Sequence, residues 1–332
     1  MKKKSVLRTK KGARKKIAIL KGGPSLEHEV SLKSARNVSR RLVRDIYEPT
    51  EIFIGKDGGW EIPIEELKQT ADAVFVALHG TYGEDGTVQT LLEHTGIPFT
   101  GSGSLASALA MNKYLTGRLF KDAGISTPRS LLISKVNWHA SVPAAWDWVR
   151  LYCGYPVVVK PNDNGSSVGV YIVRTKDELV LALGEVFRVS CAALIQPFLE
   201  GREITCAVLD HGIPKTAHAL LPTEIIPQTS GFFDYEAKYA PGGSLEITPA
   251  RIPASFTQLA QRVAVLAHTL VGARGFSRTD MIIGRDGTLH VLEINTIPGL
   301  TEESLLPKAA EASGIAFEDL LHQVIEASFR ER

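Results

Sequence analysis

The chain has 332 residues, of which 44% are hydrophobic and 22% charged, a composition typical of globular proteins that excludes a disordered or fibrous chain. At about 150 residues per domain, this length favours two or three domains. The three cysteines, Cys153, Cys191 and Cys206, lie far apart, so the sequence predicts neither a disulfide framework nor a cysteine zinc site and fits a reducing cytoplasm.

The basic charge is concentrated at the N-terminus. Residues 1–16 contain nine Lys or Arg and no acid, and removing them leaves 29 basic against 36 acidic residues, a net charge of −7. We interpret this tail as a disordered, solubilising extension, with contact to nucleic acid or a membrane surface as the alternative. Only 17–20 are apolar before Lys21, too few for a secretory signal, and no run approaches the roughly 18 apolar residues of a membrane span. We therefore expect no nucleic-acid and no membrane partner.

The body begins with alternating strand and helix signals. Apolar runs at 17–20 and 73–78 predict buried strands, and apolar residues at helical spacing follow each of them. Alternation of this kind predicts a parallel sheet whose ligand-facing loops lie beyond the carboxyl ends of the strands. We assign 17–103 to an N-terminal α/β substrate domain.

The rest of the chain mixes short strands with longer helices, which predicts α+β architecture. Helices are predicted at about 104–123, 142–152, 176–188 and 254–271, with two more at the end of the chain. Strands are predicted at 129–134, 157–160, 170–173, 194–196, 204–209, 276–283 and 289–294. We expect a central subdomain at 104–196 and a C-terminal subdomain at 197–332.

The clearest geometric signal is a hairpin around Asp286-Gly287, which we interpret as a two-residue turn. Such a turn places Asp280 opposite Glu293 and Arg278 opposite Asn295, all on one side of the sheet. The other side is then expected to carry Met281, Ile283, Leu292 and Ile294.

Two carboxylates and an amide oxygen beside an arginine are hard ligands that suit Mg²⁺ held jointly with phosphates. A solvent-facing charged pair is the alternative, but opposed acids destabilise a hairpin unless a cation is present.

Two loops add weaker signals. Lys160 precedes the Gly- and Ser-rich loop 161–169, which can present backbone N–H groups to phosphate, although many hairpins carry such turns. The stretch 21–31 joins a strand end to a helix start, a usual position for a ligand, although acids there also complement the helix dipole. Neither stretch is a P-loop or a dinucleotide-binding fingerprint.

Together these segments resemble the D-alanine–D-alanine ligases of the ATP-grasp superfamily. The matching stretches, in family order, are GGPSLEHEVSLKSA (22–35), ALHGTYGEDGTVQTLLEHTGIPFTGSG (77–103), KPNDNGSSVGV (160–170), EGREI (200–204), FFDYEAKY (232–239), ITPARIP (247–253), SRTDMII (277–283) and LEINTIPGLTEESLLPKAA (292–310). They cover nearly the whole body of the chain.

The resemblance implies an ATP-grasp fold, with an N-terminal parallel-sheet domain and two α+β domains that clasp ATP. It implies a cytoplasmic enzyme that joins two D-alanines through an acyl phosphate, releases ADP and phosphate, and supplies peptidoglycan synthesis. Mg²⁺ or Mn²⁺, as two ions, and a homodimer are family expectations.

The resemblance also implies residue roles by motif position. The metal ligands are expected to be Asp280, Glu293 and Asn295, and the oxyanion is expected to be stabilised by Arg278 and the Gly299 N–H. Contacts to ATP are expected from Lys113, Lys160, Gln196, Leu199, Glu203 and Lys238. Substrate contacts are expected from Glu27, His79, Ser304 and Leu305, and a lid link from Glu27 through Ser166 to Tyr239. Simple packing is the alternative for His79 and Tyr239.

The chain departs from the family pattern near the expected ATP site. Asn112 stands where Asp is usual, Gly117 where a basic residue is common, and Gln196-Pro197 at an adenine hinge that usually carries Glu. Because Gln keeps a carbonyl that can accept from the adenine amino group, we expect altered ATP affinity at most. A D-alanine–D-lactate or D-alanine–D-serine ligase is the alternative of the same fold, and an inactive ATP-binding protein with a nucleic-acid-contacting tail is a more remote one.

Overall fold

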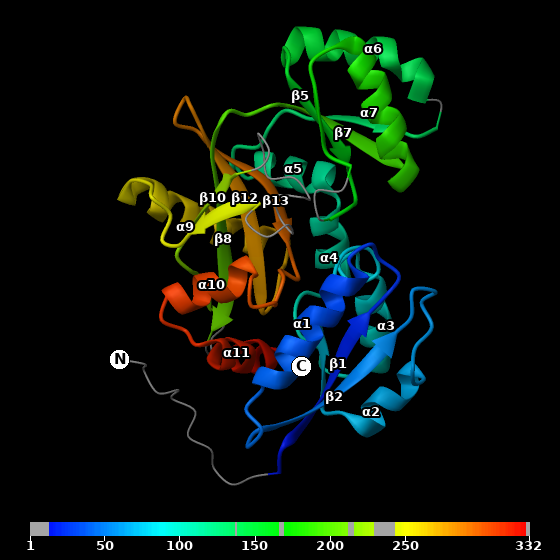
Figure 1. Cartoon of the computed structure of the whole chain (residues 1–332), viewed down its shortest axis with the longest axis vertical. Coiled ribbons are helices and arrows are strands. Elements are labelled where there is room, and N and C mark those ends of the chain that lie inside the picture. The colour runs from blue at the N-terminus through cyan, green and yellow to red at the C-terminus, as the bar shows by residue number, and fades with distance from the viewer. Residues whose placement is uncertain (1–12, 137, 166–168, 212–215, 229–242, 330–332) are drawn as a thin grey trace.

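The computed structural model describes residues 13–136, 138–165, 169–211, 216–228 and 243–329. Three sheets follow one another along the long axis of the molecule, with the N-terminal sheet at the bottom of the view and the four-stranded sheet at the top (Figure 1). None of the helices in these ranges is long and apolar enough to cross a membrane.

The N-terminal sheet is parallel, which confirms the expectation from the strand–helix alternation. Its order is β2-β1-β3, with β1 at Lys15–Gly22, β2 at Tyr47–Ile54 and β3 at Ala73–Val76. The accompanying helices are α1 (His28–Arg41), η1 (Ile64–Glu66), α2 (Leu67–Thr70) and α3 (Thr87–Thr95). Strand β1 begins at Lys15, two residues before the apolar run at 17–20, so its first two residues belong to the stretch 1–16 that was assigned to the tail.

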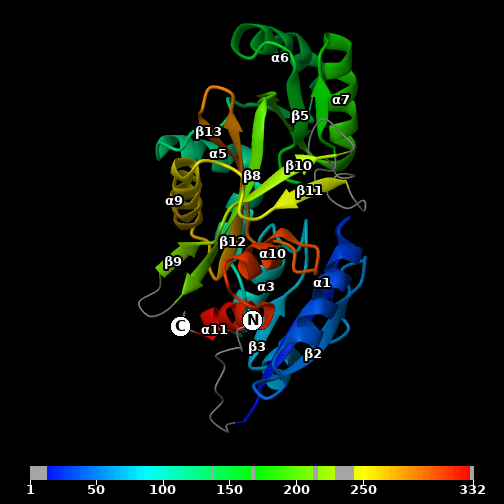
Figure 2. The same cartoon turned by 60° about the vertical axis from the view of Figure 1, so that its left-hand side comes forward.

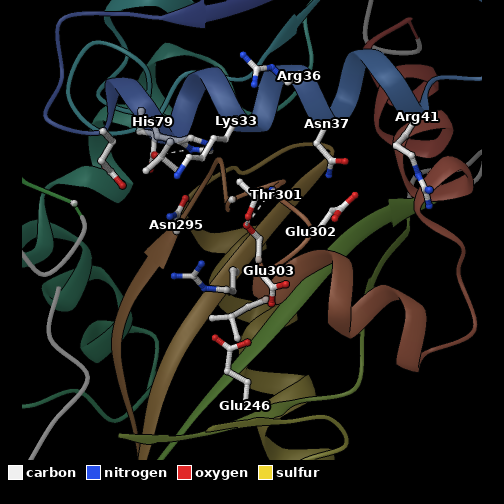
Figure 3. A pocket seen from close by; sticks show the side chains of 18 of the residues that line it. Lys33, Arg36, Asn37, Arg41, His79, Glu246, Asn295, Thr301, Glu302 and Glu303 are labelled. Atoms are coloured by element: carbon white, nitrogen blue, oxygen red, sulfur yellow. Dashed lines mark hydrogen bonds and ion pairs between the residues drawn. The ribbon is translucent and has the colours of Figure 1, made fainter. Parts of the chain in front are cut away.

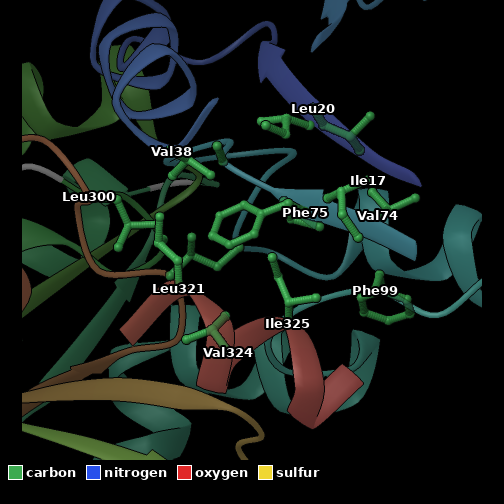
Figure 4. Close-up of a cluster of buried hydrophobic side chains, with 14 of the residues drawn as sticks. Ile17, Leu20, Val38, Val74, Phe75, Phe99, Leu300, Leu321, Val324 and Ile325 are labelled. Carbon is green, nitrogen blue, oxygen red and sulfur yellow. The ribbon is translucent and has the colours of Figure 1, made fainter. Parts of the chain in front are cut away.

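The last helix of the chain, α11 (Phe317–Phe329), packs against this first sheet. Figure 4 shows Leu321 and Ile325 of α11 beside Phe75 of β3 and Val38 of α1, and all four belong to one buried apolar cluster. Burying a Leu or Ile side chain contributes roughly 1.5–3 kcal/mol. The C-terminal helix therefore completes the core of the N-terminal domain, although the sequence analysis placed all of 197–332 in the C-terminal subdomain.

The second sheet is antiparallel and carries two helices on one face. Its order is β4-β7-β5-β6, formed by β4 (Leu131–Ser134), β7 (Ala192–Pro197), β5 (Val157–Pro161) and β6 (Tyr171–Val173). Helices α6 (Trp138–Tyr152) and α7 (Lys176–Val189) share a core with Val157 and Val159. Because strand side chains alternate, Val158 and Lys160 face the opposite side, toward the rest of the molecule.

The third sheet is the largest and lies in the middle of the molecule (Figure 2). Its strands are β11 (Ser244–Ile247), β10 (Thr223–Pro227), β8 (Gly201–His211), β12 (Phe276–Gly284) and β13 (Leu289–Asn295) in that order, with β9 (Thr216–Ala219) paired to β8. The remaining helices are α4 (Ser104–Met111), α5 (Lys113–Asp122), α9 (Ala254–Leu270) and α10 (Leu305–Ala312). Ala110 of α4 and Phe120 of α5 are buried in the core of this sheet together with α9, so these two helices pack with the C-terminal subdomain rather than with the central one.

The β12–β13 hairpin has the expected pairs but not the expected turn. Arg278 pairs with Asn295 and Asp280 with Glu293. The turn, however, is a three-residue loop, closed by a 2.9 Å hydrogen bond from Gly284 N to the Thr288 carbonyl and turned by Gly287 at φ +78°.

A β-bulge corrects the register that the longer turn would shift. Met281 pairs with Val291, so Leu292 is the additional residue on β13. Met281, Ile283 and Ile294 lie in the core as expected, but Leu292 does not: it lines a pocket on the Asp280 side, and Val291 takes the core position. The expectation for Leu292 was wrong because a strict period of two does not hold across a bulge.

Candidate active site

Two pockets meet at the ends of the β12–β13 hairpin. The inter-sheet pocket, about 130 Å³, lies between the second and third sheets. The α1–α10 cleft, about 570 Å³, lies between α1 and the start of α10 (Figure 3). Gly165 and Glu293 line both, so a molecule in one can touch a molecule in the other.

The inter-sheet pocket has apolar walls and polar ends. Val158 and Ile172 of the second sheet face Ile282 and Leu292 of the hairpin. Of the residues expected to contact ATP, five line this pocket: Lys113, Lys160, Gln196, Leu199 and Glu203. The sixth, Lys238, lies outside the described residues. Flat apolar walls with cations at one end suit an aromatic ring that carries phosphates.

Two of the departures from the family pattern have a local explanation. Gln196 Nε2 donates to Ser130 Oγ at 2.9 Å, so the other end of the amide, its carbonyl oxygen, is the atom that can accept a hydrogen bond in the pocket. Asn112 is the N-cap of α5, and its Oδ1 accepts from Leu115 N at 3.0 Å, which is the capping role that Asp would also fill. Gly117 is not among the residues that line the inter-sheet pocket.

Cations of the chain itself neutralise the two opposed carboxylates. Arg278 Nε and Nη2 donate to the two oxygens of Asp280 at 2.8 Å each, and Thr205 Oγ1 donates to Asp280 Oδ1 at 2.6 Å. Lys113 Nζ lies 3.3 Å from Glu293 Oε2 and also donates to the Asn164 carbonyl at 2.6 Å. Two opposed acids were expected to need a nearby positive charge, and Arg278 and Lys113 supply it.

The donor set fits a hard cation but does not complete its coordination. No three His, Cys, Asp or Glu side chains gather as metal ligands in the described part of the chain. The expected set contributes two carboxylates and one amide, and Asn295 Oδ1 already accepts from Ile297 N at 2.8 Å. Oxygen donors of this kind suit Mg²⁺ that takes its remaining ligands from phosphate and water.

The carboxylate of Glu27 lies close to the backbone of two glycines. A Cβ added to Gly80 would lie 2.7 Å from Glu27 Oε2, and one added to Gly165 would lie 2.9 Å from the same oxygen. Gly80 also has φ +73°, a conformation that favours glycine. The carboxylate of Glu27 is therefore held against Gly165, directly before Ser166, but Ser166 and Tyr239 lie outside the described residues.

His79 lies at the inner end of the cleft and is fully enclosed by polar partners. Its Nδ1 faces the Ile297 carbonyl at 3.2 Å and Glu84 Oε1 at 3.5 Å, and its Nε2 faces Ser34 Oγ at 2.8 Å. Burial alone lowers the pKa of His79, but the hydrogen bond and charge of Glu84, with a further contribution from Glu27, raise this pKa above its ordinary value.

Glu84 is buried, and its Oε1 accepts a hydrogen bond from Gly80 N at 2.9 Å. Burial raises the pKa of Glu84, the His79 hydrogen bond lowers it, and the charge of Glu27 raises it, so that the net shift is upward. The inner end of the cleft therefore places an imidazole and a carboxyl group, both with raised pKa values, 3.5 Å apart.

The start of α10 forms the opposite side of the cleft. Ser304 is the N-cap of α10, and its Oγ accepts from Thr301 N at 3.0 Å instead of capping the helix. A Cβ on Gly299 would lie 2.7 Å from Ser304 Oγ, so the Gly299 backbone packs directly on this hydroxyl. Helix N-termini attract anions, so Ser304 and the Leu305 N–H suit a carboxylate.

Lys308 connects this helix start to the third sheet. Its Nζ donates to Glu303 Oε2 at 2.8 Å and to Glu246 Oε2 of β11 at 3.0 Å, and these contacts raise the pKa of Lys308 against the lowering effect of its burial. Glu246 and Glu303 both line the cleft. Figure 3 shows them below α1; Arg41 of this helix points toward the same side, whereas the side chain of Arg36 lies on the opposite side of the helix.

Sequence reasoning missed several of these residues. Glu84, Thr205, Glu246 and Lys308 were given no role, and neither were the cleft-lining cations of α1. For Glu84 the signal was present, because it follows a buried strand in the loop that carries His79. For Lys308 and Glu246 there was none, since 62 residues separate them.

Sequence comparison identifies the family. A family profile described as "D-ala D-ala ligase N-terminus" matches residues 16–69 and 61–102, and one described as "D-ala D-ala ligase C-terminus" matches residues 119–326. The chain belongs to the D-alanine–D-alanine ligase family. The D-alanine--D-alanine ligase of Geotalea uraniireducens is 40% identical over 314 residues, which cover 95% of this chain and 96% of that protein.

Solved structures share the fold along nearly the whole chain. The Bacillus anthracis D-alanine--D-alanine ligase complexed with ATP is 34% identical, with a TM-score of 0.78 over 96% of this chain and 98% of that one. A D-Ala:D-Ser ligase from Enterococcus faecalis is 33% identical, with a TM-score of 0.82 over 95% of this chain and 100% of that one. The ATP-grasp fold expected from the sequence is thereby confirmed, but the fold alone does not distinguish ligases that take different second substrates.

Proposed function

We propose that this protein is a cytoplasmic, ADP-forming ligase that joins two D-alanines to D-alanyl-D-alanine for peptidoglycan synthesis. The observation that carries the proposal is the meeting of two pockets at Gly165 and Glu293. One contains the described residues that the family resemblance assigns to ATP, and the other contains those that it assigns to the amino acids. A homodimer remains part of the proposal on family resemblance alone.

ATP binds in the inter-sheet pocket. The adenine lies between the apolar walls, with Gln196 and Leu199 at its edge and Glu203 at the ribose. The phosphates extend toward Lys113, Lys160 and Lys238. Asp280, Glu293 and Asn295 would hold two Mg²⁺ or Mn²⁺ ions, which supply charge neutralisation at the transferred phosphoryl group when bound.

The first D-alanine binds at the inner end of the cleft. Its ammonium pairs with Glu27 beside His79, which directs its carboxylate toward Gly165 and Glu293, where the cleft meets the inter-sheet pocket. A carboxylate oxygen attacks the γ-phosphorus, the bond to ADP breaks, and an acyl phosphate forms. Positioning of the two reactants accounts for most of the acceleration of such a step.

The second D-alanine binds at the start of α10. Ser304 Oγ and the Leu305 N–H take its carboxylate, and its neutral amine attacks the acyl carbon and gives up one proton to the departing phosphate. Arg278 and the Gly299 N–H stabilise the oxyanion, after which the carbon–oxygen bond to phosphate breaks and inorganic phosphate leaves. Tyr239, linked through Ser166 to Glu27, closes the lid and excludes water from the acyl phosphate.

The test is phosphate release with each candidate second substrate, followed by identification of the product. The full chain with ATP, Mg²⁺ and D-alanine should release phosphate and form D-alanyl-D-alanine, whereas L-alanine should give neither. Absence of the dipeptide in the presence of ATP hydrolysis would contradict the proposal.

The D-alanine–D-serine alternative rests on the TM-score of 0.82 to the Enterococcus faecalis enzyme. Supplying D-alanine with equal D-serine or D-lactate decides it by product ratio. We expect the dipeptide of D-alanine to dominate, and Tyr239→Phe to raise the share of the lactate ester at acidic pH. A mixed dipeptide as the main product of the unaltered chain would favour the alternative.

A further inference from the structure

A third cavity lies behind the inter-sheet pocket and has no role in the proposed reaction. This connector pocket, about 650 Å³, is formed by α5, by the connector 123–130 that leads to β4, and by α6. Pro128 lines both the connector pocket and the inter-sheet pocket. Ser130 lines the connector pocket and accepts the 2.9 Å hydrogen bond from Gln196.

The connector pocket is positively charged. Arg118 and Lys121 of α5 and Arg129 of the connector line it, with Asp122 as the only acid among its lining residues. Within the described ranges, none of these three cations forms an ion pair with a carboxylate. Three like charges around one cavity repel each other, and an anion in the cavity would remove that repulsion.

Aromatic rings line the same cavity. Trp148 and Tyr152 lie one turn apart on α6, with ring centroids 6.1 Å apart and planes tilted by 45°, and Tyr114 contributes a third ring from α5. Tyr152 is 55% exposed, so its ring is accessible to a ligand. Ring faces stack with bases, and guanidinium groups bind phosphate through paired hydrogen bonds.

From this combination we infer that the connector pocket is a second nucleotide-binding site, separate from the site of ATP cleavage. The phosphate of a purine mononucleotide lies among Arg118, Lys121 and Arg129, and its base stacks on Trp148 and Tyr152.

The position of this site connects it to the ATP pocket. Its walls come from α5, which packs with the third sheet, and from α6, which covers the second sheet. The connector between them is tied to β13 by a 2.9 Å hydrogen bond from Val291 N to the Ser126 carbonyl. A nucleotide that bridges the two walls favours one relative placement of the two sheets between which ATP binds.

The test is binding of guanosine 5′-monophosphate to the full chain while saturating ADP and Mg²⁺ occupy the inter-sheet pocket, measured by calorimetry. We expect one equivalent to bind. The double variant Arg118→Gln/Arg129→Gln should weaken binding at least about 10-fold because it removes two charge-assisted contacts. Arg150→Gln is the matched control, since Arg150 is an exposed arginine of α6 that pairs with Asp147 and does not line the pocket.

A second experiment distinguishes a site that binds nucleotides from a site that binds any phosphate anion. Trp148→Leu should weaken binding of guanosine 5′-monophosphate but leave binding of inorganic pyrophosphate unchanged. ADP binding and the thermal midpoint, measured in parallel, verify that each variant is folded.

Three results would overturn the inference. These are no saturable binding in the presence of ADP, binding that the arginine double variant leaves unchanged, or equal binding of pyrophosphate with no effect of Trp148→Leu.

Discussion

The inter-sheet pocket and the α1–α10 cleft are built in different ways. The walls of the inter-sheet pocket are faces of two sheets. Val158, Ile172 and Ile282 are therefore positioned by the pairing of the strands that carry them. The walls of the cleft are loops and helix ends, positioned by single polar contacts such as Ser304 to Thr301 and Glu84 to Gly80.

This difference predicts different responses to substitution. Ladder hydrogen bonds to neighbouring strands hold the backbone of a strand residue, so the loss of one side chain changes the pocket little. A loop residue depends on one or two contacts, so the loss of one contact changes the binding of one substrate. Substitutions at the shared wall, in the cleft alone and outside both pockets should therefore have separable effects.

The largest effect is expected at the shared wall. Glu293→Gln removes a carboxylate that lines both pockets and leaves Lys113, 3.3 Å away, without this charge partner. Phosphate release should fall by at least about 10²-fold, the scale of losing one key electrostatic group. Glu311→Gln, on the exposed face of α10, is the matched control and should keep its rate. Near-normal turnover of Glu293→Gln at saturating Mg²⁺ would contradict the metal assignment.

A smaller and more selective effect is expected from Lys308→Met. This change removes the contacts to Glu303 at 2.8 Å and to Glu246 at 3.0 Å, which hold the start of α10 on β11. The KM for the second D-alanine should rise roughly fivefold, equivalent to about 1 kcal/mol, because these two partly exposed contacts together contribute about that much.

The KM for ATP separates positioning from general damage to the fold. It should stay within about twofold in Lys308→Met, as should both constants in Lys176→Met, an exposed lysine of α7. If the two KM values rise together in Lys308→Met, the cleft and the inter-sheet pocket are not separable as proposed.

Glu84→Gln tests whether Glu84 raises the pKa of His79. Because Glu84 is the main group that raises the pKa of His79, its loss should lower that pKa. The measurement is the NMR titration of the His79 ring, assigned with His79→Gln. Glu93→Gln on α3, whose carboxylate contacts Ser104, should leave the titration unchanged. An unchanged titration in Glu84→Gln would show that Glu84 does not raise the pKa of His79.

The same group makes stability depend on pH. The folded chain, with the higher His79 pKa, binds this proton more tightly than the unfolded chain does. Its contribution is therefore complete below about pH 6.5, the reference value, and is lost as pH rises through the folded pKa. The thermal midpoint should thus fall over this interval in the unaltered chain, and in Glu84→Gln the fall should be smaller and should end at lower pH.

Sequence patterns predicted what short-range geometry determines. The expected two-residue turn placed Asp280 opposite Glu293, and this pair is observed although the turn itself is different. The three-residue loop and the bulge at Leu292 compensate each other, so that two unexpected features left the site register intact. Bulges depend on tertiary packing and have no local signature strong enough to be seen in one sequence.

What the sequence could not predict depends on contacts between distant segments. The strands β2, β9, β10 and β11 were not predicted, and two of them, β10 and β11, form the edge of the third sheet that reaches the cleft. The docking of α11 on the N-terminal sheet joins the two ends of the chain, and an amphipathic helix does not specify which sheet it will cover.

The smallest effect is expected outside both pockets, at the N-terminal tail. A chain that begins at Ala13 should retain its turnover within about twofold, because it keeps all of β1. It also keeps the contact of Arg14 with Glu48, an exposed pair of the kind that contributes only about 0–1 kcal/mol. A chain that begins at Lys16 loses Lys15, whose N donates to the Ile46 carbonyl at 2.8 Å and whose Nζ contacts Glu326 at 2.8 Å. This second chain should be less stable by roughly 1–2 kcal/mol, the scale of two lost hydrogen bonds, with unchanged KM values. Urea unfolding and phosphate release of both chains measure the difference. An insoluble or inactive Ala13 chain would show that residues 1–12 contribute to the folded body, and equal stability of the two chains would show that Lys15 does not hold β1 to the C-terminal helix.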